Sequence, residues 1–598
     1  MVWRWCCCAL ALLLLSGGCS RSVHCPKSNV LLVTIDTCRA DHTSPYGYPG
    51  TETLTLEALA SEGILFEEAF TPVPLTLPAH SSLFTGWYPA RHGVRDNANY
   101  MLTDDAVTLA EVFQQNGYAT AGFVAVMLLS RQRGMAQGFD LFDDNFSASA
   151  YGTGNPNVER NAEEIATAAI HWLETNKRSP FFLFVHFYDP HIPYTPPSPW
   201  DAEYADRPYD GEIAYVDFQL GQIIVWMQKN GLLGNTLVVV MSDHGESLWE
   251  HREMAHGMFL YNCTLHVPLI MRLPDKARTS RLEGARVKGT VSLIDVMPTI
   301  LDLVELPCPE TDGVSFVPCL SGKQHEVGPI FAESMYPLFF NWSPLYAIYQ
   351  PPWKYVLAPE QELYNLEEDP KEEKNLFSED HPKVAELKPI LQEEIAHLED
   401  QSHVAGLKPE KTEILGALAY ARGGTISNAT LSSLPDPKSR TRVYVLIDEG
   451  LAQMARGEMV AAEFSFLQAS KQDPENPSPY LNLGEIYARQ RQWAKALLYT
   501  QRTLDLAPDN LWAQLQMANI LLEAERYDEA RNRFLAIRQE FPLLSSAQFG
   551  LGRIAEAQGN YEEALHWYSE ALRITPNLPG LRDCFRRAQG KMKRPADG

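Results

Sequence analysis

The chain has 598 residues, with 50 Lys and Arg against 75 Asp and Glu, and a formal net charge of −25. This length is enough for more than one domain and an ample core. The strong negative charge argues against nucleic-acid binding and provides no general attraction to anionic membranes. The function must therefore be sought in individual motifs.

The N-terminal residues have the pattern of an export signal. Arg4 precedes an apolar core from Trp5 to Leu15, and Cys19 follows. The apolar core is too short for a comfortable membrane span. The ending resembles a bacterial lipoprotein box, with Ser16 where Leu is usual. We predict an exported lipoprotein, anchored by lipid in the bacterial cell envelope; simple cleavage of the signal is the alternative.

Two apolar runs far apart in the sequence each end in an acid. Asn29–Ile35 is followed by Asp36, and the run Thr236–Met241 leads through one Ser to Asp243 and His244. Both runs have the character of buried parallel strands. Open α/β sheets keep their chemistry at the carboxyl ends of such strands. The pattern predicts one metal site formed by the two acids and the imidazole.

The segment from Thr76 to Gly86 lies between these two strands and resembles the signature of the sulfatases, a branch of the alkaline phosphatase superfamily. That signature is Cys-x-Pro-Ser-Arg, then four residues, then Thr-Gly. Three positions match, namely Pro78, Thr85 and Gly86. Three positions differ, with Thr76 in the place of the Cys, Ala79 in that of the Ser and His80 in that of the Arg.

The resemblance extends from about Asn29 to Phe377. Further matching stretches are Tyr46–Tyr48, Phe184–Tyr194, Tyr209–Tyr215, His256–Tyr261, Val267–Ile270 and Glu362–Asp369. It implies an α/β fold in which a mostly parallel sheet lies between helices, with a small C-terminal sheet subdomain. It also implies a hydrolase acting on sulfuric or phosphoric ester bonds.

Thr76 is the most important departure from the family pattern. In the family the Cys becomes formylglycine, whose hydrate attacks sulfur and then expels sulfate by collapsing to the aldehyde. Thr76 has a single hydroxyl and lacks the second oxygen that this step requires. It can still attack phosphorus and be released by water. Phosphodiesterases and phosphoethanolamine transferases of the superfamily are similar in having Thr here. The alternative is a hydroxyl in a degenerate site.

The resemblance implies metal ligation by Asp36, Asp243 and His244, with the Thr76 oxygen at the open position. Calcium sulfatases usually have Asn where this chain has His244, and Thr37 replaces a second Asp. A nitrogen ligand favours manganese, zinc or iron without excluding calcium. We predict one divalent ion, with Mn, Zn or Ca as the candidates.

Two further histidines resemble family positions near the substrate. His191 matches a residue that contacts the leaving group or acts as general acid. His256 stands where sulfatases place a Lys that touches the substrate anion. Together with Asp189 they could form a second metal site. Asp189 is otherwise expected to bind substrate, and its alternative role is to cap a loop.

Three other residues receive weaker predictions. Asn97 follows Thr76 by 21 positions, where related phosphodiesterases and phosphonate hydrolases place an amide that holds a non-bridging oxygen; a turn residue is the alternative. His80 is predicted to orient Thr76, with a structural histidine as the alternative. His186 lies in an apolar strand and is interpreted as a core residue.

The C-terminal third is repetitive. Pro474, Pro508, Pro542 and Pro576 are 34 residues apart. Aligned on them, three columns of similar residues appear: Gly450, Gly484, Ala518 and Gly552; Ala462, Ala496, Ala530 and Ala564; and Phe466, Thr500, Phe534 and Tyr568. Period and columns resemble the tetratricopeptide repeat, which implies an all-α superhelix with a concave face for a protein or peptide. Packing on the catalytic domain is the alternative use of the array.

The prediction is a sulfatase-like, metal-dependent hydrolase that cleaves a sulfate ester or, given Thr76, a phosphate ester or diester through a covalent threonine intermediate. Its anionic substrate could be carried by a glycan or a lipid. A phosphoryl or phosphoethanolamine-type transferase and a non-catalytic envelope scaffold remain alternatives. The expected domains are a signal peptide (1–19), a tether (20–28), the catalytic domain (29–400), a linker (401–440) and the repeats (441–590).

Overall fold

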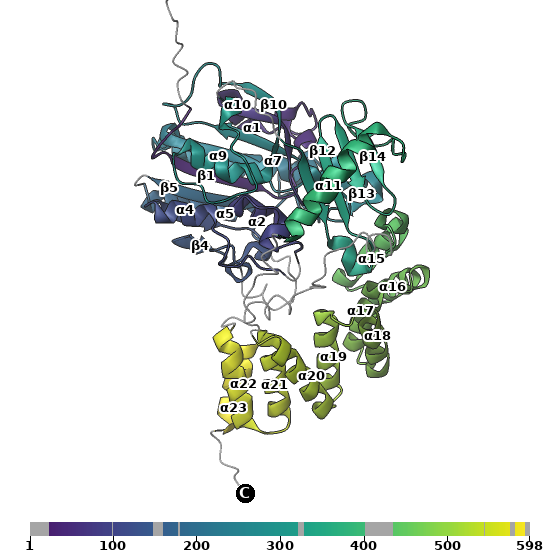
Figure 1. The fold of residues 1–598 in the computed structure, drawn as a ribbon. Coiled ribbons are helices and arrows are strands. Elements are labelled where there is room, and N and C mark those ends of the chain that lie inside the picture. The colour runs from purple at the N-terminus through teal and green to yellow at the C-terminus, as the bar shows by residue number, and fades with distance from the viewer. Residues whose placement is uncertain are drawn as a thin grey trace, which may run out of the picture.

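The computed structural model describes residues 23–97, 100–146, 159–177, 180–320, 328–400, 434–542, 544–574 and 580–592. The predicted leader and most of the predicted linker lie outside these ranges. Among the described residues, no helix has both the length and the apolar character of a membrane span. The described chain forms a large α/β domain followed by a curved array of helices (Figure 1).

An eight-stranded sheet forms the centre of the α/β domain, in the order β10-β2-β9-β6-β1-β5-β3-β4. Every neighbouring pair is parallel except those that β9 makes with β2 and β6. The strands are β1 (Asn29–Ile35), β2 (Ile64–Phe70), β3 (Ala119–Phe123), β4 (Leu141–Asp143), β5 (Phe181–Phe187), β6 (Thr236–Ser242), β9 (His266–Arg272) and β10 (Ala285–Ser292). Strands β1, β5 and β6 are buried along their whole length, which explains their apolar sequences.

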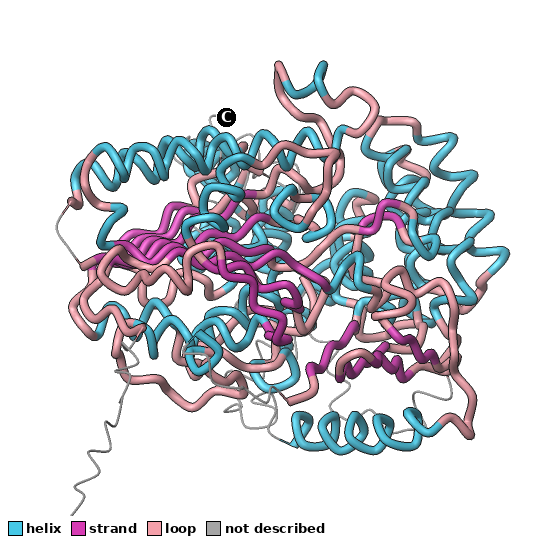
Figure 2. The backbone as a smooth tube through the Cα atoms, turned by 90° about the horizontal axis from the view of Figure 1, so that it is seen from above, coloured by secondary structure: helices cyan, strands magenta, loops and turns pink. Residues whose placement is uncertain are grey.

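Helices cover both faces of this sheet (Figure 2). In one group, α7 (Pro208–Lys229) contacts α1 (Leu54–Glu62), α5 (Ala162–Thr175) and α6 (Trp200–Glu203). The other group consists of α2 (Thr76–Thr85), α3 (Pro89–His92), α4 (Leu109–Gln115), α9 (Val296–Leu303) and α10 (Val317–Leu320). This confirms the predicted layers.

The small C-terminal sheet is also confirmed. It is antiparallel and consists of β11 (Ile330–Ser334), β12 (Leu345–Gln350), β13 (Trp353–Leu357) and β14 (Glu362–Asn365). Helix α11 (Pro382–Asp400) packs on β12 and β13 (Figure 1). A two-stranded ribbon of β7 (Ser247–Leu248) and β8 (Met254–Ala255) and the short α8 (Asn262–Leu265) complete the loops beside the main sheet.

The repeats form antiparallel helix pairs that curve beneath the α/β domain in Figure 1. They are α15 (Thr441–Ala455) with α16 (Met459–Gln472), α17 (Pro477–Arg489) with α18 (Trp493–Leu506), α19 (Leu511–Glu523) with α20 (Tyr527–Glu540), α21 (Ser545–Ala557) with α22 (Tyr561–Ile574), and then α23 (Leu581–Met592). The small residues of one aligned repeat position pack against the aromatic residues of another. A Cβ atom added to Gly450 would clash with the Phe466 ring, and one added to Gly552 would clash with the Tyr568 ring. Small residues therefore let paired helices approach.

The first repeat shares a core with the α/β domain. Val443, Tyr444 and Ile447 of α15 belong to the same buried apolar cluster as Phe259 and Trp342 of the α/β domain. Polar contacts cross the same boundary, because the Trp342 indole N–H donates to Asp473 over 2.7 Å. The array thus packs on the catalytic domain at its first end.

Candidate active site

The two predicted strand-end acids lie together. Cα pairing places Ile35 of β1 opposite Ser242 of β6, so that Asp36 and Asp243 leave the sheet at the same edge. His244 Nε2 lies 3.8 Å from Asp36 Oδ1, 3.5 Å from Asp243 Oδ2 and 3.4 Å from Thr76 Oγ1. All four side chains are fully buried. The structure therefore brings the four predicted metal-site residues into one cluster.

The charges of this cluster suit a cation. Asp243 Oδ1 accepts the backbone N–H groups of Thr37 and His244, whereas Asp243 Oδ2 has no hydrogen-bond partner among the described residues. Burial raises the pKa of Asp36 to about 7, and burial together with repulsion from Asp36 raises that of Asp243. A divalent cation would offset both the cost of burying the carboxylates and the repulsion between them, because it gives them a counter-charge.

Thr76 is the first residue of α2, whose ten residues are all buried. Its hydroxyl therefore lies at the positive end of the helix dipole, which favours negative charge on oxygen. Asn97 is half-buried and accepts the Leu77 backbone N–H through Oδ1 over 2.9 Å, so it completes the first turn of α2 from outside. Its amide is thus held beside Thr76, with the Nδ2 donors left to face another acceptor.

His80 and His186 extend the cluster on its buried side. His80 bonds through Nδ1 to the Thr76 carbonyl (2.8 Å) and through Nε2 to the Thr34 hydroxyl (2.9 Å). His186 Nε2 lies 3.2 Å from Asp36 Oδ2. Burial lowers the pKa of both rings to about 4, so both are neutral at neutral pH. His186 is buried as interpreted, but it also contacts a candidate metal ligand, which the sequence interpretation missed.

His80, His186 and Asp243 offer a second set of ligand atoms within 4.8 Å of one another. The first such set is Asp36, Asp243 and His244, and the described residues contain no third one. Asp243 belongs to both sets. The two sets therefore overlap at Asp243.

The imidazole rings of His191 and His244 both lie next to that of His256. The centroid of His256 lies 4.3 Å from that of His244 and 5.1 Å from that of His191. Glu246, which the sequence interpretation missed, is fully buried and holds His256 Nδ1 over 2.9 Å. Because Nδ1 is bonded to Glu246, Nε2 is the ring nitrogen of His256 that a ligand could contact. The only signal for Glu246 was its place directly after Asp-His-Gly.

Asp189 makes a capping contact, as in the alternative to the predicted substrate-binding role. Its Oδ1 accepts the backbone N–H of Ala162 over 3.0 Å, at the first turn of α5. It lines a cavity to which no residue of the Asp36 cluster contributes. The second metal site that Asp189, His191 and His256 could form is not among the sets of described residues whose ligand atoms lie within 4.8 Å of one another. The physical reason is that the Asp189 carboxylate is directed to a helix N-terminus, where it stabilises unpaired N–H groups.

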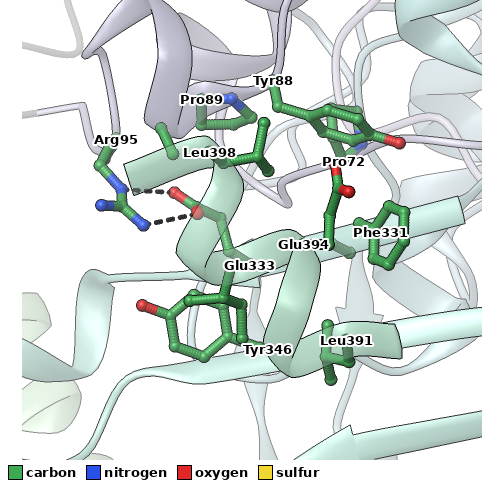
Figure 3. Close-up of a pocket in the computed structure, with 13 residues that line it drawn as sticks. Pro72, Tyr88, Pro89, Arg95, Phe331, Glu333, Tyr346, Leu391, Glu394 and Leu398 are labelled. Atoms are coloured by element: carbon green, nitrogen blue, oxygen red, sulfur yellow. Dashed lines mark hydrogen bonds and ion pairs between the residues drawn. The ribbon is translucent and has the colours of Figure 1, made fainter. Parts of the chain in front are cut away.

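The loop that carries Asn97 is clamped to the small sheet (Figure 3). Arg95 forms a forked ion pair with Glu333 of β11, with N–O distances of 2.7 and 2.6 Å. The Glu333 backbone N–H donates to the Pro72 carbonyl, four residues before Thr76. Tyr88, Phe331 and Leu398 line the small apolar pocket around this pair. A forked pair fixes both partners in one geometry, so it holds the Asn97 segment against α2.

Comparison with known proteins agrees with this architecture. Residues 28–306 match the family model described as Sulfatase, and residues 250–401 match that described as N-sulphoglucosamine sulphohydrolase, C-terminal. Residues 447–510 and 515–579 match the Tetratricopeptide repeat model. The chain thus contains a sulfatase domain with an alkaline phosphatase-like fold, followed by tetratricopeptide repeats.

Individual relatives point to the same class. Arylsulfatase K of Xenopus laevis is 25% identical over 478 residues, which cover 64% of this chain and 86% of the relative. Choline-sulfatase of Rhizobium meliloti is 27% identical over 433 residues, which cover 58% of this chain and 82% of the relative. The crystal structure of phosphonate monoester hydrolase of Agrobacterium radiobacter has a TM-score of 0.53 at 23% identity, covering 62% of this chain and 96% of that chain, and supports the fold. The protein is an ester-hydrolysing enzyme.

Proposed function

We propose that the protein hydrolyses phosphate esters or diesters with a divalent metal ion, using Thr76 as a covalent nucleophile. The observation that carries the proposal is the position of the Thr76 hydroxyl, 3.4 Å from His244 in a buried cluster with two carboxylates. A single hydroxyl supports attack on phosphorus, whereas sulfate release in the family requires the second oxygen of a formylglycine hydrate. Sulfate esters are therefore the less favoured substrates.

Each residue has a separate part in the reaction. A metal ion held by Asp36, Asp243 and His244 would supply positive charge that lowers the proton affinity of the nucleophile. The Thr76 oxygen bonds to phosphorus as the bond from phosphorus to the ester oxygen breaks, and the departing oxygen takes up a proton. Water then attacks phosphorus, and Thr76 leaves with its proton restored. Asn97, His191 and His256 would face the oxygens of the phosphoryl group and the leaving group. Glu246 positions the His256 ring, and His80 bonds to the first turn of α2.

A substrate panel tests this function. Aryl sulfate, phosphate monoester, phosphate diester and phosphonate are offered to the purified protein with Mn²⁺, Zn²⁺ or Ca²⁺. We expect a phosphorus ester to have the highest kcat/KM. A clear preference for aryl sulfate would contradict the phosphoryl assignment. Product bonded to an added acceptor alcohol, in place of free acid, would identify a transferase.

Replacing Asp243 by Asn tests the metal site. Asn keeps the shape of the side chain but removes the charge that both candidate ligand sets share. We expect at least a tenfold weaker metal affinity, about 1.4 kcal/mol or more, measured as metal content after dialysis. The matched control is Asp295→Asn, a buried acid that caps the Ser292 turn away from the cluster. Equal metal content in wild type and Asp243→Asn would contradict the assignment.

The remaining parts of the proposal concern location and partners. We infer that the protein acts in the cell envelope and is lipid-anchored at Cys19, on the basis of the sequence pattern. The outer repeats are proposed to bind a protein segment. In support, α18, α19 and α20 line a groove of about 660 Å³ that includes Leu498, whose side chain is exposed. The first repeat, in contrast, is occupied by its contact with the catalytic domain.

A further inference from the structure

A cavity of about 680 Å³ lies beside α5 and α7, where the Pro193–Trp200 loop covers it. Its lining includes two acids, Asp189 and Glu212, and three aromatic residues, Tyr188, Trp200 and Tyr215. None of the residues of the Asp36 cluster lines it. This volume falls within the range of small-molecule sites. Nothing in the proposed reaction uses it.

The cavity is lined by several carboxyl groups and a single basic side chain. The one basic residue in its lining, Arg160, is already close to Asp143 (3.2 Å) and Glu164 (3.8 Å). Among the described residues, neither Asp189 nor Glu212 makes an ion pair with a basic side chain. Buried carboxylates without a cationic partner are costly, so the cavity favours a positively charged ligand.

Both carboxylates are held in place by backbone groups. Asp189 Oδ1 accepts the Ala162 N–H, while Asp189 Oδ2 is buried and has no hydrogen-bond partner in the described part of the chain. Glu212 is 4% exposed, and its Oε1 accepts the Thr195 N–H over 2.7 Å. Burial and the neighbouring Asp189 raise the pKa of Glu212 to about 8, so Glu212 is largely protonated at neutral pH in the empty cavity, and a bound cation would favour its ionised form. Each carboxylate is thus held by one backbone N–H, and neither is paired with a basic side chain in the described part of the chain.

Aromatic rings form the rest of the lining. The Trp200 ring lies 5.0 Å from the Tyr215 ring and 5.3 Å from the Phe218 ring, tilted by 57° and 55°. Phe218 is 49% exposed. Tyr188 is 1% exposed, and its hydroxyl has no partner among the described residues. Aromatic faces attract cations, and organic ammonium groups in particular.

A metal ion is a poorer occupant than an organic cation. The carboxylates of this cavity do not form a set of ligand atoms within 4.8 Å, since the described residues contain only the two sets around Asp243. Calcium and magnesium require several oxygens close around the ion, whereas an ammonium group can meet carboxylates and rings that are further apart.

We propose that this cavity binds an organic ammonium group, with Asp189 and Glu212 facing its charge and the rings of Trp200 and Tyr215 covering its alkyl part. The ligand is a small amine, either primary or quaternary. The cavity is separate from the Asp36 cluster, although Tyr188 in its lining stacks on His191 at 4.4 Å, and the proposal stands even if Thr76 proves not to be a nucleophile.

Titration calorimetry on the full-length protein tests the proposal with three probes: choline, ethanolamine and 3,3-dimethyl-1-butanol, which is the neutral isostere of choline. We expect saturable binding of at least one cation and none of the neutral isostere. Tighter binding of choline would identify a quaternary ligand, and tighter binding of ethanolamine a primary amine. Absence of binding by both cations, or equal binding of the neutral isostere, would overturn the proposal.

Matched variants connect the binding to the cavity. Glu212→Gln keeps the acceptor for the Thr195 N–H but loses the charge, so cation affinity should fall by about tenfold or more, the effect of losing one charge-assisted contact. Trp200→Leu should weaken choline binding in the same direction. Glu163→Gln removes an exposed acid at the rim and should leave affinity within about twofold, as for an exposed charge pair. Loss of binding in Glu163→Gln but not in Glu212→Gln would refute the assignment. Thermal unfolding checks that every variant is folded.

Discussion

The Thr76→Ala protein is expected to lose hydrolysis by about 10⁴-fold or more, because removal of a covalent nucleophile leaves only binding and electrostatic contributions. Thr76→Ser keeps the hydroxyl and loses one methyl group, so its rate should stay within about tenfold of wild type. The measurement is kcat/KM on the best substrate of the panel. Acid quenching during turnover, followed by peptide mass analysis, should find the transferred group on Thr76 of the wild type.

Ser81→Ala is the matched control for Thr76→Ala. Ser81 is a buried hydroxyl on the same helix, but it donates to the Leu77 carbonyl over 2.8 Å and is thereby occupied. Its loss should cost about 1 kcal/mol of stability and leave the metal content unchanged. Equal rates for Thr76→Ala and wild type would remove the covalent mechanism. Equal losses in both variants would show that α2 is merely sensitive to substitution.

The sequence predicts the central cluster because parallel strands deliver their carboxyl ends to one edge of a sheet. The closeness of Asp36 and Asp243 could be predicted once the two strands before them were recognised. Glu246 and His186 were missed for a different reason. Both are fully buried, and apart from the place of Glu246 directly after Asp-His-Gly, the sequence does not distinguish an acid or a histidine that contacts the site from one that does not. Their roles depend on contacts with His256 and Asp36.

Asp189 shows what a family resemblance leaves open. The resemblance allowed a second metal site or substrate binding, with capping as the alternative, and the Asp189 carboxylate bonds to Ala162, 27 residues earlier. The repeats give a similar lesson. Their period of 34 residues predicts the helix pairs, because it records contacts within the array. It contains no information on the surface against which the first pair packs, and that surface turns out to be close to His256.

The contact path from the repeats to the active site is short. The Tyr444 hydroxyl of α15 donates to the Met254 carbonyl over 3.5 Å, two residues before His256. Glu253 Oε1 accepts the backbone N–H groups of Met258 and Phe259, which closes the loop around His256. The position of this loop therefore depends on α15, and α15 is held by the Phe466 ring of α16, which packs at Gly450.

Phe466→Ala is accordingly expected to affect both stability and catalysis. Phe466 is fully buried in the cluster that includes Met258 and Phe259, so the cavity left by Ala should lower the free energy of unfolding by about 3–5 kcal/mol. Misplacement of the His256 loop should also lower kcat by about tenfold to 100-fold. Denaturant unfolding and steady-state kinetics, at a temperature where the variant stays folded, measure the two effects.

Phe534→Ala provides the comparison, because Phe534 occupies the same repeat position and is equally buried, but in a cluster formed by the outer repeats alone. Phe534→Ala should lower the free energy of unfolding of the repeat array by about 3–5 kcal/mol. Its kcat should stay within about twofold of wild type, because distant independent sites do not couple. If Phe466→Ala leaves kcat unchanged, α15 does not support the active-site loop. If both variants lose activity equally, the effect comes from general destabilisation, and the repeats act on catalysis only through the stability of the whole chain.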